Sequence, residues 1–304
     1  MPDNVPANEF LNLEGRKIST SKNWAIWLHE YLNDFENMQD SLRYTLTVNC
    51  PENKDNDFTW KDFQSRNNNE LVAILGNYIN RVFVLTEKYF DNVVPKYEKI
   101  DSDQLLKIYN YVSSISNSLD KFKFRDSVND LIDLARTGNK YLADKEPWKL
   151  YKENNISQVE QIIYISLENC ALLSILSEPF IPNSAKKIRE ILNIKLIPWT
   201  KLRSEKKIIE PGHKIKKSNL NFNLIVLGEK FSTYPEIFDI AKKELSNEII
   251  HWGYCDSFEE YSMWLWKSDI IPVTSKQDFF GVSIVEAVYC NSKPILPNEL
   301  AYPE

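Results

Sequence analysis

Glycine is scarce in this sequence, with 7 in 304 residues, and histidine occurs only 3 times. Glycine destabilises helix interiors, so its scarcity favours long, unbroken helices. We find no run of about 20 apolar residues and therefore predict no membrane span. The start of the chain has neither a basic stretch nor an apolar run, so we expect no signal peptide. These features predict a soluble, cytoplasmic protein.

Cysteine is also rare, and its spacing does not suit metal binding. Cys50, Cys170, Cys255 and Cys290 lie far apart and form no Cys-x-x-Cys pair. Such isolated cysteines are typical of free thiols in a reducing compartment. We therefore predict four free thiols and no metal site.

Charge is distributed unevenly. Residues 217–304 hold 7 lysines against 13 acidic residues, whereas residues 1–216 are balanced at 30 of each sign. A balanced sum is compatible with a local basic face that binds nucleic acid. The acidic excess after residue 216 argues against a nucleic-acid surface there.

The first two-thirds of the chain has the apolar periodicity of helices. Asp57 is a candidate N-cap for the first of them. Five helices joined by short connections predict a mainly α structure, an antiparallel helical bundle. The predicted helices span residues 58–90, 102–120, 124–142, 157–177 and 183–193.

After residue 215 short apolar runs alternate with helical patterns. This alternation predicts a parallel, doubly wound α/β sheet, present here as a partial Rossmann-like lobe. The predicted strands are 224–227, 249–252, 270–273 and 294–296, and the helices between them are 237–245, 258–266 and 282–290.

The stretch from Gly15 to Lys22 reads Gly-Arg-Lys-Ile-Ser-Thr-Ser-Lys. Pro51–Trp60, Glu146-Pro147-Trp148 and Ile209–Ile215 follow it in order. Together these motifs resemble methionyl-tRNA synthetase from about residue 5 to residue 216. The resemblance implies ATP-dependent charging of methionine-accepting tRNA.

In that family the first motif is a mobile loop that stabilises the transferring phosphate of ATP. The resemblance therefore makes Lys17, Ser19, Thr20 and Ser21 candidate catalytic residues, because cationic and hydroxyl groups can stabilise the developing charge. Thr20 replaces a lysine of the family pattern. The family's His-x-Gly-His motif is missing, so we do not expect this chain alone to form methionyl-adenylate.

The predicted bundle resembles the family's anticodon-binding domain, which implies three candidate tRNA contacts. Asn77 and Arg81 stand at positions i and i+4 of one helix and share a face. Trp148 follows Pro147 at a helix end. Unstacked anticodon bases are recognised by aromatic stacking and by hydrogen bonds to their edges, which suits these side chains.

Residues 219–304 resemble the C-terminal lobe of two-lobed glycosyltransferases, closest to the tRNA-queuosine mannosyltransferase type. The resemblance rests on Asp278-Phe-Phe-Gly281 followed by Glu286. It implies a sugar-nucleotide site in which Glu286 binds the ribose hydroxyls at the carboxyl edge of the sheet. Asp278 and Gly281 are then expected near the donor sugar.

These resemblances divide the chain into four parts: 1–50, a remnant of a class I catalytic domain with its ATP loop; 51–200, the anticodon-binding domain; 201–218, a linker; and 219–304, a partial glycosyltransferase lobe. Anticodon binding is the favoured function. A tRNA mannosyltransferase, a non-catalytic fused remnant and a joined or truncated reading frame are the alternatives. A partner that supplies the missing catalytic lobe is a further possibility that the sequence leaves open.

Overall fold

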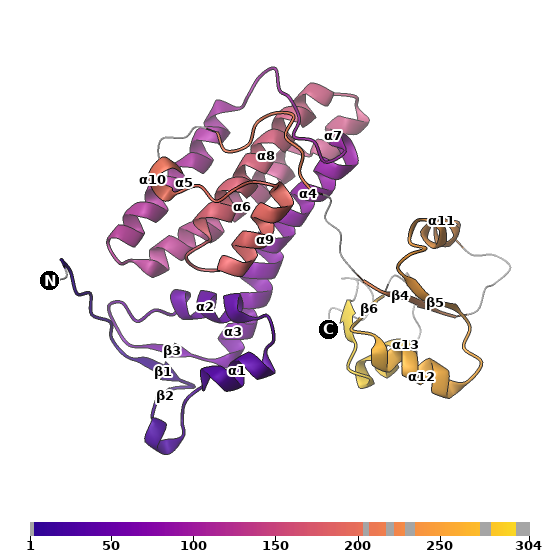
Figure 1. Cartoon of the computed structure of the whole chain (residues 1–304), viewed down its shortest axis with the longest axis horizontal. Helices are drawn as coiled ribbons and strands as arrows, with labels where there is room; N and C mark the ends of the chain where they lie inside the picture. The colour runs from indigo at the N-terminus through magenta and orange to yellow at the C-terminus, as the bar shows by residue number, and fades with distance from the viewer. Residues whose placement is uncertain (1–2, 203–206, 217–221, 229–234, 274–280, 296–304) are drawn as a thin grey trace. The chain divides into compact units, whose positions relative to one another are not determined.

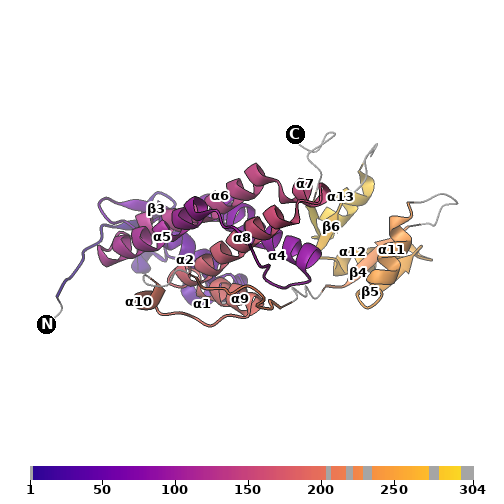
Figure 2. The same cartoon turned by 90° about the horizontal axis from the view of Figure 1, so that it is seen from above.

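The computed structural model describes residues 3–202, 207–216, 222–228, 235–273 and 281–295. The chain forms two compact units, Met1–Ser218 and Asn219–Glu304. Figures 1 and 2 show both units in two views at right angles. The candidate tRNA-binding residues all belong to the first unit, so its internal architecture decides where they lie.

A small three-stranded sheet opens the first unit. Strand β1 (Leu11–Leu13) pairs with β2 (Arg16–Lys17) in antiparallel fashion and with β3 (Asn56–Phe58) in parallel. Helices α1 (Leu28–Asp34), α2 (Gln39–Val48) and α3 (Trp60–Arg66) accompany the sheet, as Figure 1 shows. A separate apolar cluster holds these elements together, with Leu13, Tyr31, Phe58 and Phe63 buried at its centre.

This sheet changes two sequence-based expectations. The predicted boundary at residue 50 separates β1 from β3, yet the two strands pair over Leu11–Leu13 and Asn56–Phe58. Asp57 lies in β3 rather than at a helix N-cap, so that prediction is wrong. Thr59 caps α3 instead, because its hydroxyl accepts a hydrogen bond from the Asp62 amide at 3.0 Å.

The long helices of the unit match the periodicity of the sequence. The predicted helix 58–90 continues from α3 through a π-helical segment, η2, into α4. Helices α5 and α6 form a hairpin over a three-residue turn, and the long helix α8 and three shorter helices follow them. The bounds are η2 Asn67–Gly76, α4 Asn77–Phe90, α5 Ser102–Asp120, α6 Phe124–Lys145, α7 Pro147–Lys152, α8 Ile156–Leu176, α9 Pro182–Leu192 and α10 Trp199–Leu202.

Helix α8 is the centre of the bundle and packs against α4, α5, α6, α7 and α9. By length and composition alone it could cross a membrane, with a mean hydropathy of 1.4 in its most apolar window. However, 89% of that window is buried inside the unit. Such continuous burial is the property of a core helix, since a helix that is apolar all round must be covered.

Residues 207–216 differ from the linker predicted over 201–218. Ile209 and Ile215 are buried in the bundle core. The amides of Ile208 and Ile209 donate to the buried Glu168 carboxylate at 2.7 and 3.1 Å. Because this segment fills apolar space and its amides find partners, it belongs to the packed unit.

The second unit contains the strands and helices predicted from its alternating pattern. Strand β4 (Leu224–Leu227) pairs in parallel with β5 (Ile249–Gly253), and β6 (Ile270–Pro272) pairs in parallel with β7 (Lys293–Ile295). Helices α11 (Ile237–Glu244), α12 (Phe258–Lys267) and α13 (Val282–Tyr289) alternate with them. The described strands form two separate pairs, so a single doubly wound sheet is not established.

Candidate functional site

The predicted ATP loop is a hairpin held at its base by two carboxylates. The amide of Gly15 donates to both oxygens of Asp57, at 3.0 and 2.9 Å. Gly15 has a φ of +72°, a conformation that glycine adopts without strain. Glu14 accepts a hydrogen bond from the Trp60 amide at 2.8 Å. The loop is therefore fixed to β3 and to the start of α3.

The four candidate loop residues lie close together. Lys17 ends β2, and its ammonium group lies 4.8 Å from the centre of the Phe10 ring. Ser19 exchanges two backbone hydrogen bonds of 2.9 Å with Trp24, which closes the loop. Thr20 and Ser21 lie in the short 3₁₀ turn between them, and the hydroxyls of Ser19 and Ser21 are 3.2 Å apart. Lys17, Thr20 and Ser21 are exposed, and Ser19 is half-buried.

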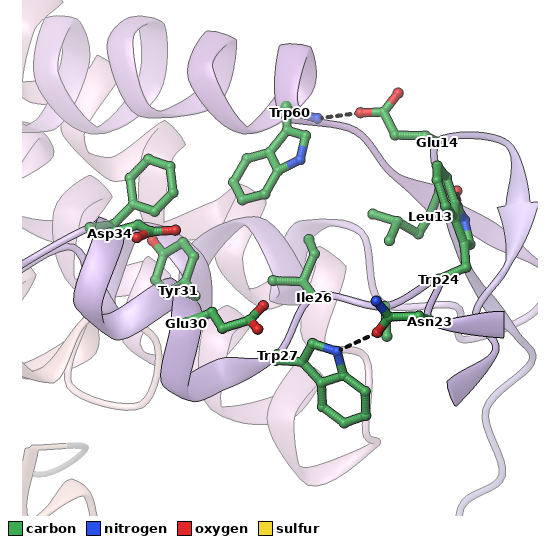
Figure 3. A pocket seen from close by; sticks show the side chains of 12 residues that line it. Leu13, Glu14, Asn23, Trp24, Ile26, Trp27, Glu30, Tyr31, Asp34 and Trp60 are labelled. Atoms are coloured by element: carbon green, nitrogen blue, oxygen red, sulfur yellow. Dashed lines mark hydrogen bonds between the residues drawn. The ribbon is translucent and has the colours of Figure 1, made fainter. Parts of the chain in front are cut away.

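A cavity of about 310 Å³ lies beside this loop (Figure 3). Its walls combine aromatic rings with three carboxylates, and hydrogen bonds hold two of the indoles. Trp24 donates to the Leu13 carbonyl at 3.0 Å, and Trp27 donates to Asn23 Oδ1 at 3.1 Å. The lining residues are Leu13, Glu14, Asn23, Trp24, Ala25, Ile26, Trp27, Glu30, Tyr31, Asp34, Phe35 and Trp60.

The structure brings two of the three predicted anticodon contacts together. The guanidinium carbon of Arg81 lies 5.6 Å from the centre of the Trp148 ring, so the cation faces the aromatic π system. Trp148 is half-buried. Asn77 is exposed and lies on α4, one turn before Arg81. Arg81 and Trp148 thus place a cation beside an aromatic ring. Asn77 lies on the same helix as Arg81.

Residues that the sequence did not single out join the helices that carry this pair. Tyr89 on α4 stacks on Tyr151 of α7, with ring centres 4.0 Å apart. Asn139 Oδ1 accepts a hydrogen bond from Arg81 at 3.4 Å, and its amide nitrogen donates to the Ile74 carbonyl at 2.9 Å. The spacing of Tyr89, Asn139 and Tyr151 in the sequence did not reveal these contacts, because each contact joins different helices.

Helix α6 makes a close contact with α4 and α8 at Gly138. A Cβ atom on Gly138 of α6 would lie 2.3 Å from Tyr78 and 2.5 Å from the Asn169 side chain. Asn169 donates to the Tyr78 hydroxyl at 3.1 Å, and that hydroxyl donates to the Ser166 carbonyl at 3.2 Å. Only glycine at position 138 allows α6 to approach α4 and α8 this closely.

The predicted sugar-nucleotide residues are only partly placed. Asp278 lies outside the described residues. Gly281 has a φ of +59° and precedes α13. Glu286 on α13 accepts a hydrogen bond from the Tyr261 hydroxyl at 2.8 Å. Burial, followed by this carboxylate, raises the pKa of Tyr261 to about 12. At least one Glu286 oxygen is thus engaged within the unit.

Two family models match the chain. Residues 1–83 match the class I (M) tRNA synthetases, and residues 95–241 match the anticodon-binding domain of methionyl-tRNA ligase. The second match extends beyond residue 218, where the two compact units divide. Neither model supports the glycosyltransferase resemblance.

Similar proteins agree with these models. A methionine–tRNA ligase from Christiangramia forsetii is 52% identical over 234 residues, which cover 74% of this chain and 34% of that protein. One from Cytophaga hutchinsonii is 55% identical over 202 residues, covering 66% and 29%. The chain thus spans about a third of the length of these curated relatives.

A solved structure shows the same fold. Mycobacterium tuberculosis methionyl-tRNA synthetase in complex with methionyl-adenylate aligns with a TM-score of 0.61 and 22% identity, covering 70% of this chain and 42% of that one. The loop-bearing sheet falls within the match to class I (M) tRNA synthetases, and the helical bundle falls largely within the match to the anticodon-binding domain. Within that class, residues 1–241 belong to the methionyl-tRNA synthetase family.

Proposed function

We propose that the helical bundle binds the anticodon of methionine-accepting tRNA through Arg81, Trp148 and Asn77. The observation that carries the proposal is the 5.6 Å contact between the Arg81 guanidinium and the Trp148 ring. An aromatic face with a cation beside it suits an unstacked base and its neighbouring phosphate. Asn77 adds an exposed amide that can hydrogen-bond a base edge.

The proposal extends to ATP only through the hairpin. Lys17, Ser19, Thr20 and Ser21 would contact the phosphates of ATP if the nucleotide-binding part of a synthetase stood beside them. Whether another polypeptide supplies that part is a second question, since the relatives are about three times as long as the matched segment. The proposal therefore does not include methionine charging by this chain alone.

Sugar-nucleotide binding by residues 219–304 remains a prediction that no comparison supports. A titration with sugar nucleotides tests it separately from tRNA binding. Retained binding after Glu286→Gln would contradict the role assigned to Glu286.

The decisive experiment is a binding titration of the purified chain against methionine tRNA and the same tRNA with a changed anticodon, at fixed salt. We expect preference for the native CAU anticodon. The Trp148→Ala variant should lose about 1–3 kcal/mol, the usual contribution of one stacked base. Trp266→Ala is the matched control, because Trp266 is exposed in the second unit. Equal affinity for both tRNAs, or an unchanged Trp148→Ala variant, would contradict the proposal.

A further inference from the structure

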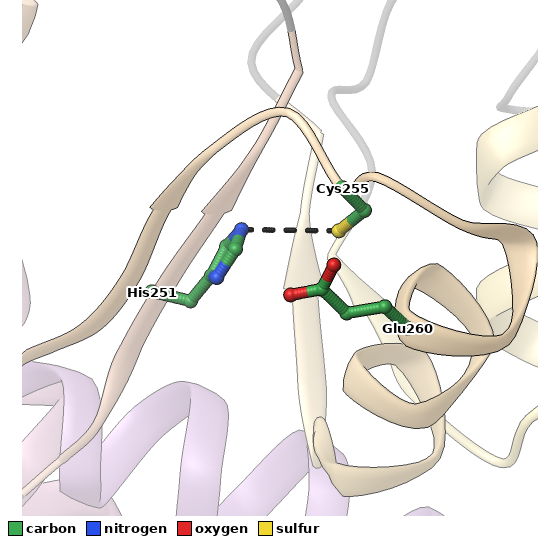
Figure 4. A group of neighbouring side chains, drawn as sticks. All are labelled: His251, Cys255 and Glu260. Atoms are coloured by element: carbon green, nitrogen blue, oxygen red, sulfur yellow. Dashed lines mark hydrogen bonds between the residues drawn. The ribbon is translucent and has the colours of Figure 1, made fainter.

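Three side chains with different metal-ligating atoms converge in the second unit, although the cysteine spacing predicted no metal site. His251 lies on β5, Cys255 follows that strand, and Glu260 lies in the first turn of α12. Figure 4 shows the imidazole, thiol and carboxylate directed toward a common space. One ligand atom from each lies within 4.8 Å of the other two. The pattern was missed because it mixes three residue types.

The separation between two of these atoms fits a shared ion. His251 Nε2 and Cys255 Sγ are 3.8 Å apart. A tetrahedral zinc ion, with bonds of about 2.3 Å to sulfur and about 2.0–2.1 Å to nitrogen, holds these atoms about 3.5 Å apart. The observed distance exceeds that value by only a few tenths of an ångström, so small side-chain rotations suffice to bind the ion.

The third group is held in place by the start of α12. Ser257 caps this helix by accepting a hydrogen bond from the Glu260 amide at 3.1 Å. Glu260 reaches back and accepts a hydrogen bond from the Asp256 amide at 3.1 Å through Oε2. These two contacts, one to the N-cap and one to the residue before it, hold the carboxylate in a variant of the capping box. Capping accounts for Glu260, and a hydrogen bond joins Cys255 Sγ to His251 Nε2, but neither contact explains why all three groups lie within 4.8 Å of one another.

We propose that His251, Cys255 and Glu260 bind one zinc ion, with water as the fourth ligand. Thiolate and imidazole together favour zinc over magnesium or calcium, which prefer oxygen ligands. The exposed carboxylates of Asp256 and Glu259 add negative charge around the cluster. Binding converts the Cys255 thiol to a thiolate and releases its proton to solvent.

The site is local, because all three ligands fall within ten residues of sequence. An ion bound there would join the end of β5 to the start of α12. Three protein ligands leave one position open, as in zinc sites that bind an exchangeable water. This inference is independent of the tRNA-binding proposal, which concerns the other unit.

Metal titration of the full chain tests the site. After treatment with a chelator, the protein is titrated with zinc in competition with a chromophoric chelator, and separately with cobalt. We expect one equivalent of zinc and a thiolate-to-cobalt charge-transfer absorption. Loss of one ligand in Cys255→Ser or His251→Gln should weaken zinc binding more than about 100-fold, since changes outside the ligand set already cost 10–100-fold.

Cys290→Ser is the matched control, because Cys290 is a free, buried cysteine of the same unit outside the cluster. It should bind zinc as the unchanged chain does. Absence of stoichiometric zinc binding would overturn the proposal. So would cobalt binding without the thiolate absorption, a result that needs no variant and is unaffected by a folding defect. Equal loss in Cys290→Ser and Cys255→Ser would also overturn it.

Discussion

Both carboxylate oxygens of Asp57 accept a hydrogen bond from the backbone amide of Gly15, at 3.0 and 2.9 Å. The two residues are 42 positions apart in sequence. Their contact ties the turn that carries the candidate ATP loop to β3, the strand that leads into α3. The loop's position therefore depends on a residue that belongs to a different motif of the sequence.

We expect Asp57→Ala to release the base of this hairpin. A hydrogen bond to a charged group contributes about 1.5–3 kcal/mol, and partial exposure of Asp57 places this one toward the lower value. Hydrogen exchange should accelerate at the Gly15 amide and through the loop. Asp55→Ala, which removes an exposed contact to the Phe10 amide, is the control. Equal exchange at Gly15 in both variants would refute the anchoring role.

Gly138→Ala should destabilise the bundle. The added methyl group would lie 2.3 Å from Tyr78 and 2.5 Å from the Asn169 side chain, so both must move. Overpacking of this kind costs about 1–3 kcal/mol. Urea unfolding measures the loss. Lys140→Ala, an exposed change on the same helix, should remain within about 0.5 kcal/mol of the unchanged chain. Comparable stabilities of the two variants would show that the helices tolerate the methyl group.

The buried Glu168 should make stability depend on pH. Burial raises the pKa of Glu168 above its ordinary value of 4.5, against the opposing effect of hydrogen bonds from Tyr109, Ile208 and Ile209. The folded state therefore holds this proton to higher pH than the unfolded state. Its stabilising contribution is present below 4.5 and is lost as pH rises through the raised pKa.

Glu168→Gln should remove this part of the pH dependence, because an amide does not titrate. Urea unfolding at a series of pH values from 4.5 upward provides the measurement. Glu153→Gln, an exposed substitution, should keep the slope of the unchanged chain. If Glu168→Gln and the unchanged chain lose stability in parallel as pH rises, Glu168 is not the source.

Arg81→Lys should weaken tRNA binding while keeping the charge. The planar guanidinium stacks on an aromatic face in a way that an ammonium group does not. The Arg81–Trp148 contact within the protein contributes about 0.5–1 kcal/mol at a partly exposed site, so its loss should weaken tRNA affinity, through poorer positioning of the ring, by no more than about two- to fivefold. Lys88→Arg, on the same helix, is the control, and the titration is that used for Trp148. If the Arg81→Lys variant binds tRNA with full affinity, Arg81 contributes to binding through its charge alone.

The helices of the bundle were predictable because their apolar residues recur at the helical period, which local sequence encodes. The strands and helices of the second unit were predictable from their alternation. The pairing of strands was not, since hydrogen bonds between β1 and β3 join segments more than 40 residues apart. The packing of residues 207–216 was missed because a polar segment that contains a proline resembles a linker. Only the structure shows that the Glu168 carboxylate accepts hydrogen bonds from amides of this segment.

The sequence by itself determined which long segments of the bundle are helical, which four loop residues lie together and which family the motifs resemble. Those properties depend on near neighbours in the chain. Only the tertiary structure decided that Arg81 faces Trp148, that Asp57 anchors Gly15 and that His251, Cys255 and Glu260 converge. Contacts between elements depend on how apolar faces pack in three dimensions. Such contacts join residues far apart in the chain and therefore produce no repeating pattern in the sequence.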